Sequence, residues 1–181
     1  YLSIDIVLGA VILLRFFSKS LSATPSILTY TLLAAGVWLI YTLDHLRDAH
    51  KAKLSHRSRY LFHLKHQRTL KIAVLLLLIY CFVCLFFIAQ ALLISVSILA
   101  ALSLGYLMIQ QFLAKYGLKE FYVAVIYSGG ILMIPFTLSK SIQLEVFMPL
   151  FFLTFSNLIL FSWFEKKEDQ MDGFHSIATV M

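Results

Sequence analysis

Apolar residues fill six long runs of this chain, and short polar segments separate the runs. The runs cover residues 2–17, 27–43, 72–89, 91–109, 121–138 and 146–164. Most of them approach the roughly 20 residues that an α-helix needs to cross the hydrocarbon core of a bilayer. The pattern therefore predicts an all-α fold, a polytopic transmembrane helical bundle with about six transmembrane helices.

Composition supports a membrane protein and excludes an ordinary soluble domain. Hydrophobic residues make up 61% of the chain and charged residues 13%, and the mean hydropathy is +0.88. No repeat, low-complexity tract or soluble domain boundary interrupts the sequence, so we expect a single membrane domain over residues 1–181. The chain begins with Tyr1 and is apolar from its start, so we expect its first helix to be clipped.

Basic residues are distributed unevenly among the connections between the runs. All but three of the 15 Lys and Arg residues follow the second, fourth and sixth runs: Arg47, Lys51, Lys53, Arg57, Arg59, Lys65, Arg68, Lys71, Lys115, Lys119, Lys166 and Lys167. The exceptions are Arg15, Lys19 and Lys140. Short cytoplasmic loops carry an excess of Lys and Arg. We therefore expect an integral, multi-pass protein of a bacterial inner (cytoplasmic) membrane, with these basic connections in the cytoplasm.

Acidic residues are scarce, and two pairs of them close apolar segments. Asp44 and Asp48 follow the second run, and Glu168 and Asp172 follow the sixth, in a chain with 9 acidic residues. A spacing of four places both carboxylates of a pair on one helix face. Near a helix C-terminus a carboxylate is unfavourable by about 0.3–1 kcal/mol, which a bound cation would offset. These residues are either solubilising charges at the membrane surface or, as we expect, Mg²⁺ ligands on the cytoplasmic face that hold a diphosphate.

The polar segment after the second run is strongly basic. The positive-inside rule alone accounts for such residues, which also attract anionic lipid. In a functional interpretation, Arg57, Arg59 or Lys65 reaches the metal site and neutralises a diphosphate leaving group. Membrane lipids are expected partners in either case, and nucleic acid is not.

Four segments of the chain fit the pattern of one known family. Tyr41-Thr-Leu-Asp44-His-Leu-Arg-Asp48 matches the latter part of an N-D-x-x-D-x-x-x-D motif. Glu168-x-x-x-Asp172-x-x-x-Ser176-x-x-Thr179 is similar to a D-x-x-x-D-x-x-x-G-x-x-T motif. Tyr116-Gly-Leu-Lys119-Glu120 resembles a segment between helices four and five, and Arg57-Ser-Arg59-Tyr60 occupies the place of an Arg-Pro loop. In these features the chain resembles the UbiA superfamily of intramembrane prenyltransferases.

The resemblance implies a nine-helix fold, of which this chain covers the first six helices as a fragment of a longer protein or a truncated relative. It implies Mg²⁺ as the cofactor, with a polyprenyl diphosphate and an aromatic or other lipophilic acceptor as substrates. The catalytic and metal-binding residues that it implies are Asp44, Asp48, Glu168 and Asp172. The diphosphate-binding residues that it implies are Arg59, Lys119, Arg57 and Tyr116.

Two other functions stay open. Ile40 and Tyr41 replace the leading Asn and Asp of the first motif, which favours a non-catalytic UbiA-like membrane scaffold or carrier. Asp169-Gln-Met-Asp172-Gly173 matches the opening of the CDP-alcohol phosphotransferase signature. The Ala-Arg expected next in that signature is absent, and the acidic pair after the second run is left without a role.

Overall fold

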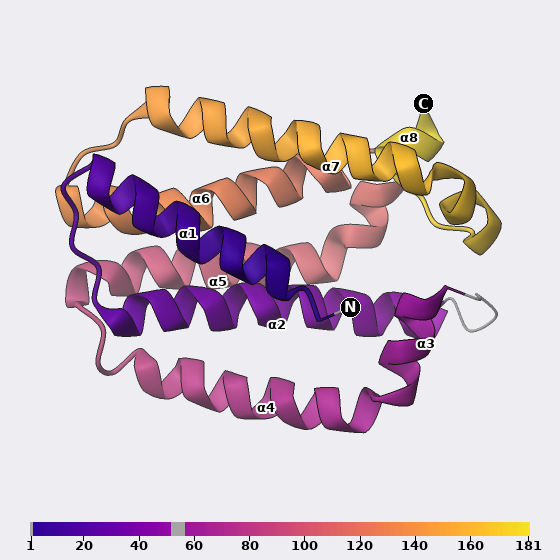
Figure 1. Ribbon diagram of the computed structural model, residues 1–181, viewed down its shortest axis with the longest axis horizontal. Helices are drawn as coiled ribbons and strands as arrows, with labels where there is room; N and C mark the ends of the chain where they lie inside the picture. The colour runs from indigo at the N-terminus through magenta and orange to yellow at the C-terminus, as the bar shows by residue number, and fades with distance from the viewer. Residues whose placement is uncertain (1, 52–56) are drawn as a thin grey trace.

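The computed structural model describes residues 2–51 and 57–181, and within these ranges it contains helices and no strand. In chain order the helices are α1 (Ile4–Ser20), α2 (Ile27–Lys51), α3 (Ser58–Lys65), α4 (Gln67–Cys84), α5 (Gln90–Lys115), α6 (Lys119–Ser139), α7 (Leu144–Asp172) and α8 (Ile177–Val180). The long helices run side by side along the longest axis of the molecule (Figure 1). The predicted all-α bundle is confirmed.

Five of the described helices, α2, α4, α5, α6 and α7, are long and apolar enough to cross a membrane. The remaining long helix, α1, has 17 residues and is not among them, so the described residues hold five such helices where the apolar pattern predicted about six. The short helix α3 lies in the polar segment for which that pattern predicted no element. Because five of the described helices are long and apolar enough to cross a membrane, the protein is a membrane-embedded helical bundle.

Helix α6 packs against three other helices, α1, α5 and α7. Contacts continue from α1 to α2, and from α2 to α3 and α4. Fully buried side chains at the contact of α1 and α6 include Ala10, Leu14, Ile131 and Leu132. The outer helices α4 and α7 keep many large apolar side chains exposed, which suits a surface that faces lipid.

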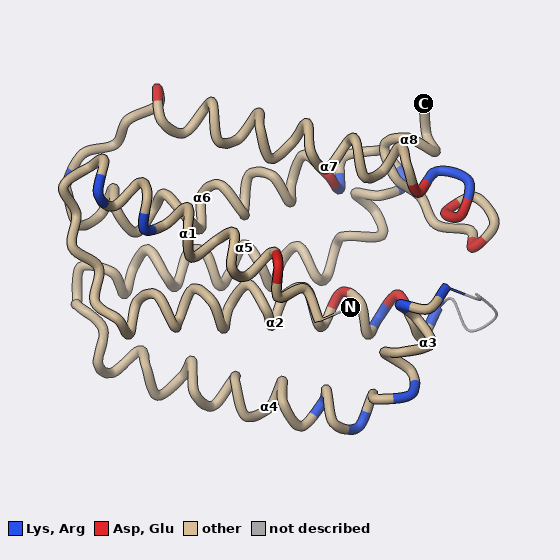
Figure 2. The backbone as a smooth tube through the Cα atoms, in the orientation of Figure 1, with Lys and Arg blue, Asp and Glu red and all other residues tan. Residues whose placement is uncertain are grey.

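Most charged residues gather at one end of the bundle (Figure 2). This charged end comprises the end of α2, α3, the start of α4, the α5–α6 connection, the end of α7 and α8. Lys53, one of the basic residues used to predict orientation, lies outside the described residues. Because α2 and α7 both end here, the structure places the two predicted acidic pairs at the same end of the bundle.

Candidate functional site

Arg57, immediately before α3, contacts four carboxylates at the end of α7. Its Nε lies 2.9 Å from Asp172 Oδ2 and 3.1 Å from Glu168 Oε2. Its Nη2 donates to Asp169 Oδ1 at 3.0 Å, and its Nη1 lies 3.5 Å from Glu165 Oε2. We call these four acidic residues the α7 carboxylate cluster. The side chains of Arg57, Asp169 and Asp172 are 11%, 12% and 13% exposed, so solvent screens the contacts among these three residues weakly. The carboxylates of Glu165 and Glu168 are 38% and 63% exposed, so their contacts with Arg57 are screened more strongly.

Arg59, in the first turn of α3, makes a second bridge between α3 and α7. Its Nη2 lies 3.3 Å from Glu165 Oε2, and its Nη1 donates to Glu165 Oε1 at 3.4 Å. The guanidinium group also lies 5.2 Å from the ring centroid of Tyr60. Burial by itself lowers the pKa of Arg59, but the Glu165 carboxylate and the Tyr60 hydroxyl outweigh it and raise the pKa above its ordinary value. The guanidinium group of Arg59 therefore remains positively charged at neutral pH.

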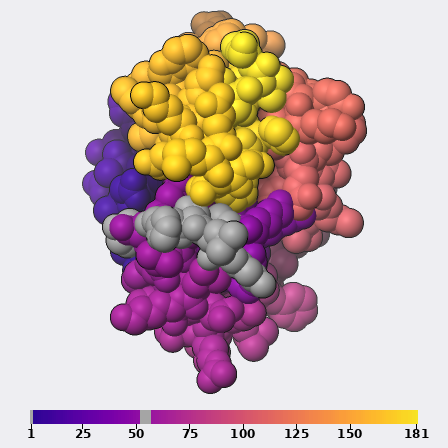
Figure 3. All heavy atoms as spheres, turned by 90° about the vertical axis from the view of Figure 1, so that its right-hand side faces the viewer, coloured from indigo at the N-terminus to yellow at the C-terminus, as the bar shows by residue number. Residues whose placement is uncertain are grey.

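A glycine fixes the end of α7 next to α3. Gly173 has φ +71°, in the left-handed region that favours glycine. The backbone N–H of Phe174 donates to Asp169 O at 2.8 Å, and that of Gly173 donates to Gln170 O at 3.4 Å, which is the Schellman arrangement. The Phe174 ring then packs against the Tyr60 ring, with centroids 5.9 Å apart. In Figure 3 the yellow end of α7 lies directly beside the purple residues of this region.

A separate ion pair joins α2 to α6 at the charged end. Nζ of Lys119, the first residue of α6, lies 3.6 Å from Asp44 Oδ2, and the two side chains are 27% and 16% exposed. Asp48 lies one turn further along α2. Arg47 also lies about one turn along α2 from Asp44, and its Nη1 donates a hydrogen bond to the backbone carbonyl of Leu107 in α5. These polar contacts tie the end of α2 to both α5 and α6.

The structure thus brings most, but not all, of the predicted residues into polar contact. Those that meet between α3 and α7 are Arg57, Arg59, Glu168 and Asp172, and those that meet between α2 and α6 are Asp44 and Lys119, with Asp48 nearby. Tyr116 is 55% exposed at the end of α5. Its ring contacts the Phe112 ring and the Lys115 ammonium group, and no described contact joins it to the other predicted residues.

Two residues of the α7 carboxylate cluster, Glu165 and Asp169, were not among the predicted metal ligands. The side chain of Asp169 is 12% exposed, whereas that of the predicted Glu168 is 63% exposed. Glu165, Asp169 and Asp172 follow an i, i+4, i+7 spacing and share one face of α7. That spacing was visible in the sequence as a signal for a larger acidic face than a single pair.

Glu120, next to Lys119, is a further site residue that the predictions left out. Glu120 is buried, with 7% of its surface exposed. Its Oε1 accepts hydrogen bonds from Ser162 Oγ and from the backbone N–H of Ile177, both at 3.1 Å. No hydrogen-bond partner of its Oε2 lies among the described residues. An acid at the start of a predicted membrane helix was the signal available in the sequence, since such a group needs specific partners.

The carboxylates at this end do not fit a Mg²⁺ ion in the observed arrangement. Mg²⁺ requires several oxygen ligands at about 2.0–2.1 Å in near-octahedral geometry. Among residues 2–51 and 57–181, no group of three or more His, Cys, Asp or Glu side chains is placed to hold a metal ion. Each acidic residue of the α7 carboxylate cluster is instead in contact with the guanidinium group of Arg57, and Asp44 is in contact with Lys119.

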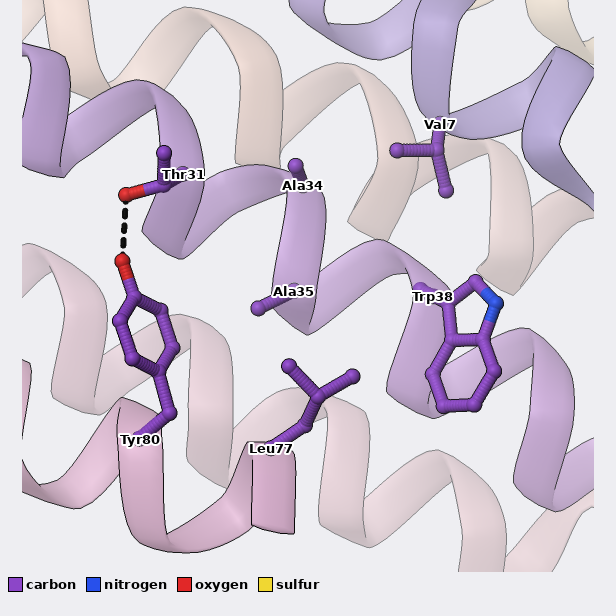
Figure 4. Close-up of a pocket in the computed structure, with 7 residues that line it drawn as sticks. All are labelled: Val7, Thr31, Ala34, Ala35, Trp38, Leu77 and Tyr80. Atoms are coloured by element: carbon purple, nitrogen blue, oxygen red, sulfur yellow. Dashed lines mark hydrogen bonds between the residues drawn. The ribbon is translucent and has the colours of Figure 1, made fainter. Parts of the chain in front are cut away.

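A groove of about 490 Å³ lies on the flank of the bundle between α1, α2 and α4 (Figure 4). It is lined by Val7, Thr31, Ala34, Ala35, Trp38, Leu77 and Tyr80. The hydroxyl groups of Thr31 and Tyr80 share a hydrogen bond of 2.6 Å, and no lining residue is charged. Trp38 precedes Asp44 by six residues, which is about 9 Å along the helix axis. The groove therefore offers apolar surface at membrane depth and no group that binds a diphosphate.

Comparison with known proteins adds no family assignment to this geometry. No family model matches the chain, and no curated protein and no solved structure is similar to it. The chemistry of the charged end and the motifs in the sequence therefore carry the functional argument.

Proposed function

We propose that this protein is an intramembrane prenyltransferase that transfers a polyprenyl group from its diphosphate to an aromatic or other lipophilic acceptor. The main observation that supports this proposal is that Arg57, Arg59 and Lys119 contact carboxylates of α2 and α7 at one end of an apolar bundle. A polyprenyl diphosphate has a highly charged head and a long apolar tail. It therefore suits a charged site that lies at the end of membrane-spanning helices. The resemblance to the UbiA superfamily supports the same function.

The geometry of α7 favours a different register for the second acidic motif. Shifted by three residues, the D-x-x-x-D-x-x-x-G-x-x-T pattern falls on Glu165, Asp169, Gly173 and Ser176. Asp169 is shielded from solvent, Gly173 has the positive φ that a glycine allows, and Ser176 is the N-cap of α8. We therefore include Glu165 and Asp169 in the proposed site, beside the two acidic residues taken from the sequence.

In the proposed reaction the bond between the allylic carbon and the diphosphate oxygen breaks, and its electron pair leaves with the diphosphate. The cationic groups of Arg57, Arg59 and Lys119 stabilise the negative charge that develops on this leaving group. A carbon or oxygen of the acceptor then forms the new bond to the allylic cation, and the acceptor loses a proton. The surrounding apolar helices exclude water that would otherwise capture the cation. The carboxylates do not fit Mg²⁺ as they stand, so these steps are described through the side chains of the protein alone.

We further infer that the charged end faces the cytoplasm, in the inner membrane of a bacterium. Of the 14 Lys and Arg residues that the structure describes, 11 lie at this end of the bundle, and the other three are Arg15, Lys19 and Lys140. An excess of basic residues in short loops marks the cytoplasmic side of a membrane protein. Labelling of cysteines introduced at exposed positions of the two ends, in intact cells, tests this orientation.

Binding of geranylgeranyl thiodiphosphate to the purified protein in detergent tests the proposed activity. We expect wild type to bind, and Arg59→Ala and Lys119→Ala to lose tenfold or more in affinity, which corresponds to about 1.4 kcal/mol each. Lys19→Ala removes the same charge as Lys119→Ala from an exposed site at the opposite end, so its affinity should equal that of wild type. Titrations with and without Mg²⁺ show whether the ion is required. Absence of binding, or equal binding by all variants, would refute the proposal.

A non-catalytic carrier of prenyl diphosphates is the second candidate. It is favoured by the ion pairs that already neutralise the carboxylates at the charged end. A carrier binds the thiodiphosphate but releases the natural diphosphate unchanged. Recovery of a prenylated product from membranes supplied with labelled geranylgeranyl diphosphate distinguishes the enzyme from the carrier.

A further inference from the structure

The α7 carboxylate cluster already contains a cation, because Arg57 lies among its four acidic residues. Nε of Arg57 contacts both Asp172 and Glu168, and its Nη2 donates to Asp169. We propose that Arg57 acts as a built-in cation that keeps divalent metal ions out of this cluster, and that withdrawal of its guanidinium group turns the cluster into a divalent-cation site.

The charge balance of the cluster supports this proposal. Four carboxylates face the two guanidinium groups of Arg57 and Arg59, so the cluster remains acidic even with both in place. Without Arg57, the same carboxylates face a single guanidinium group and repel one another at short range. A hard divalent cation offsets that repulsion, since carboxylate oxygens are the ligands that Mg²⁺, Mn²⁺ and Ca²⁺ prefer.

The geometry of the α7 carboxylate cluster also supports the proposal. An oxygen of Asp172 and an oxygen of Glu168 both lie within 3.1 Å of one Arg57 nitrogen. That nitrogen therefore marks a point on which carboxylates of successive turns of α7 converge. Arg57 itself has an extended backbone (φ −63°, ψ 123°) before the first residue of α3, so its side chain can leave the cluster without breaking a helix.

One consequence rests on the proposed function. A diphosphate binds guanidinium groups in a bidentate manner and so competes with the carboxylates for Arg57. Diphosphate and metal would then each favour binding of the other, because both require Arg57 to leave the cluster. The exclusion of metal by Arg57 does not depend on this coupling or on prenyl transfer.

Binding of Mn²⁺ alone to the full chain in detergent, followed by the electron paramagnetic resonance signal of the free ion, tests the proposal. We expect Arg57→Gln to bind Mn²⁺ at least tenfold more tightly than wild type. Arg68→Gln is the matched control, since it removes the same charge from an exposed residue of α4 at the same end and should leave Mn²⁺ affinity unchanged. Equal affinity of wild type and Arg57→Gln would overturn the proposal, whatever the result with prenyl diphosphates.

Two further variants locate the new site and guard against misfolding. Adding Asp169→Asn to Arg57→Gln should abolish the gain in Mn²⁺ affinity, whereas adding Glu145→Gln, at an exposed position of the opposite end, should preserve it. If Arg57→Gln does not yield folded protein, Arg57→Ala removes the same positive charge and should bind Mn²⁺ more tightly than wild type, whereas Arg57→Lys keeps a cation in the cluster and should show a smaller gain. A gain that survives Asp169→Asn, or no gain in Arg57→Ala, would contradict the proposal.

Discussion

The carboxylate of Glu120, in the first turn of α6, accepts a hydrogen bond of 3.1 Å from the backbone N–H of Ile177, the first residue of α8. The same oxygen accepts a second hydrogen bond of 3.1 Å from Ser162 in α7. One buried acid therefore joins the three consecutive helices α6, α7 and α8 through partners 42 and 57 positions along the chain. It also holds the segment that follows Gly173, and with it the end of α7 on which the carboxylate cluster lies.

Replacing Glu120 by Ala should loosen α8 and lower the stability of the bundle. Two buried donors would lose their acceptor, and each unsatisfied group costs about 1–3 kcal/mol. Hydrogen exchange followed by mass spectrometry should show faster exchange across residues 174–181. Glu120→Gln retains an acceptor oxygen and should show a smaller effect. Unchanged protection of this segment in Glu120→Ala would mean that other contacts hold α8.

The ion pair of Lys119 and Asp44 should contribute to stability independently of any ligand. Lys119→Met leaves the Asp44 carboxylate, 16% exposed, without its cation, and we expect a loss of about 1–3 kcal/mol. The double variant Lys119→Met/Asp44→Asn should recover part of this loss, because no uncompensated charge remains. Thermal unfolding in detergent for the four members of this cycle measures the coupling. Strictly additive effects would show that the pair contributes nothing.

The sequence was sufficient to predict the bundle because membrane helices require long apolar runs, and the runs are separated by polar connections. It did not predict α3, whose eight residues are too few and too polar to stand out from the loop around them. Helix α1, the first of the six predicted helices, has 17 residues and carries Asp5, Arg15 and Lys19, whereas the other five have the length and composition of membrane-spanning helices.

The candidate site was predicted less completely, for a physical reason. The i, i+4 spacing predicts which carboxylates share a helix face, but it does not identify their partners on other elements. Arg57 reaches Asp169 across 112 positions of the chain, and Lys119 reaches Asp44 across 75, so their pairing depends on the packing of helices. The sequence pattern predicted Arg57 as a ligand of diphosphate, whereas the structure places it among carboxylates.

Acidification should destabilise the protein in part through His63 of α3. This residue is 1% exposed, its Nδ1 lies 2.8 Å from the carbonyl oxygen of Arg59, and its ring packs 5.2 Å from that of His45. Burial lowers the pKa of His63 below its ordinary value of 6.5; the Arg59 carbonyl opposes this shift and the Arg59 guanidinium adds to it. The unfolded chain therefore binds a proton near pH 6.5 that the folded chain does not, so stability falls as pH decreases through this value.

His63→Asn isolates this contribution, since the Asn side-chain amide can still donate to the Arg59 carbonyl but does not titrate. Between pH 7.5 and pH 5.5, the thermal unfolding temperature should fall further for wild type than for His63→Asn. His175→Asn, at an exposed position, should behave like wild type. Equal pH dependence in wild type and His63→Asn would assign the effect to other groups.

The end of α7 should depend on the backbone conformation of Gly173 and not on the space around it. A Cβ at this position would meet no atom within 4 Å, but the φ of +71° is unfavourable for residues with a side chain. We expect Gly173→Ala to lower stability by about 1–2 kcal/mol, and Gly173→Asn to lower it less, because Asn tolerates the left-handed region. Gly36→Ala is the matched control, since Gly36 also has no atom within 4 Å of a Cβ but lies inside α2. That substitution should be neutral or stabilising. Similar losses for Gly173→Ala and Gly36→Ala would show that the Schellman arrangement does not hold the end of α7, and that Arg57 and the Phe174–Tyr60 contact suffice to position the carboxylate cluster.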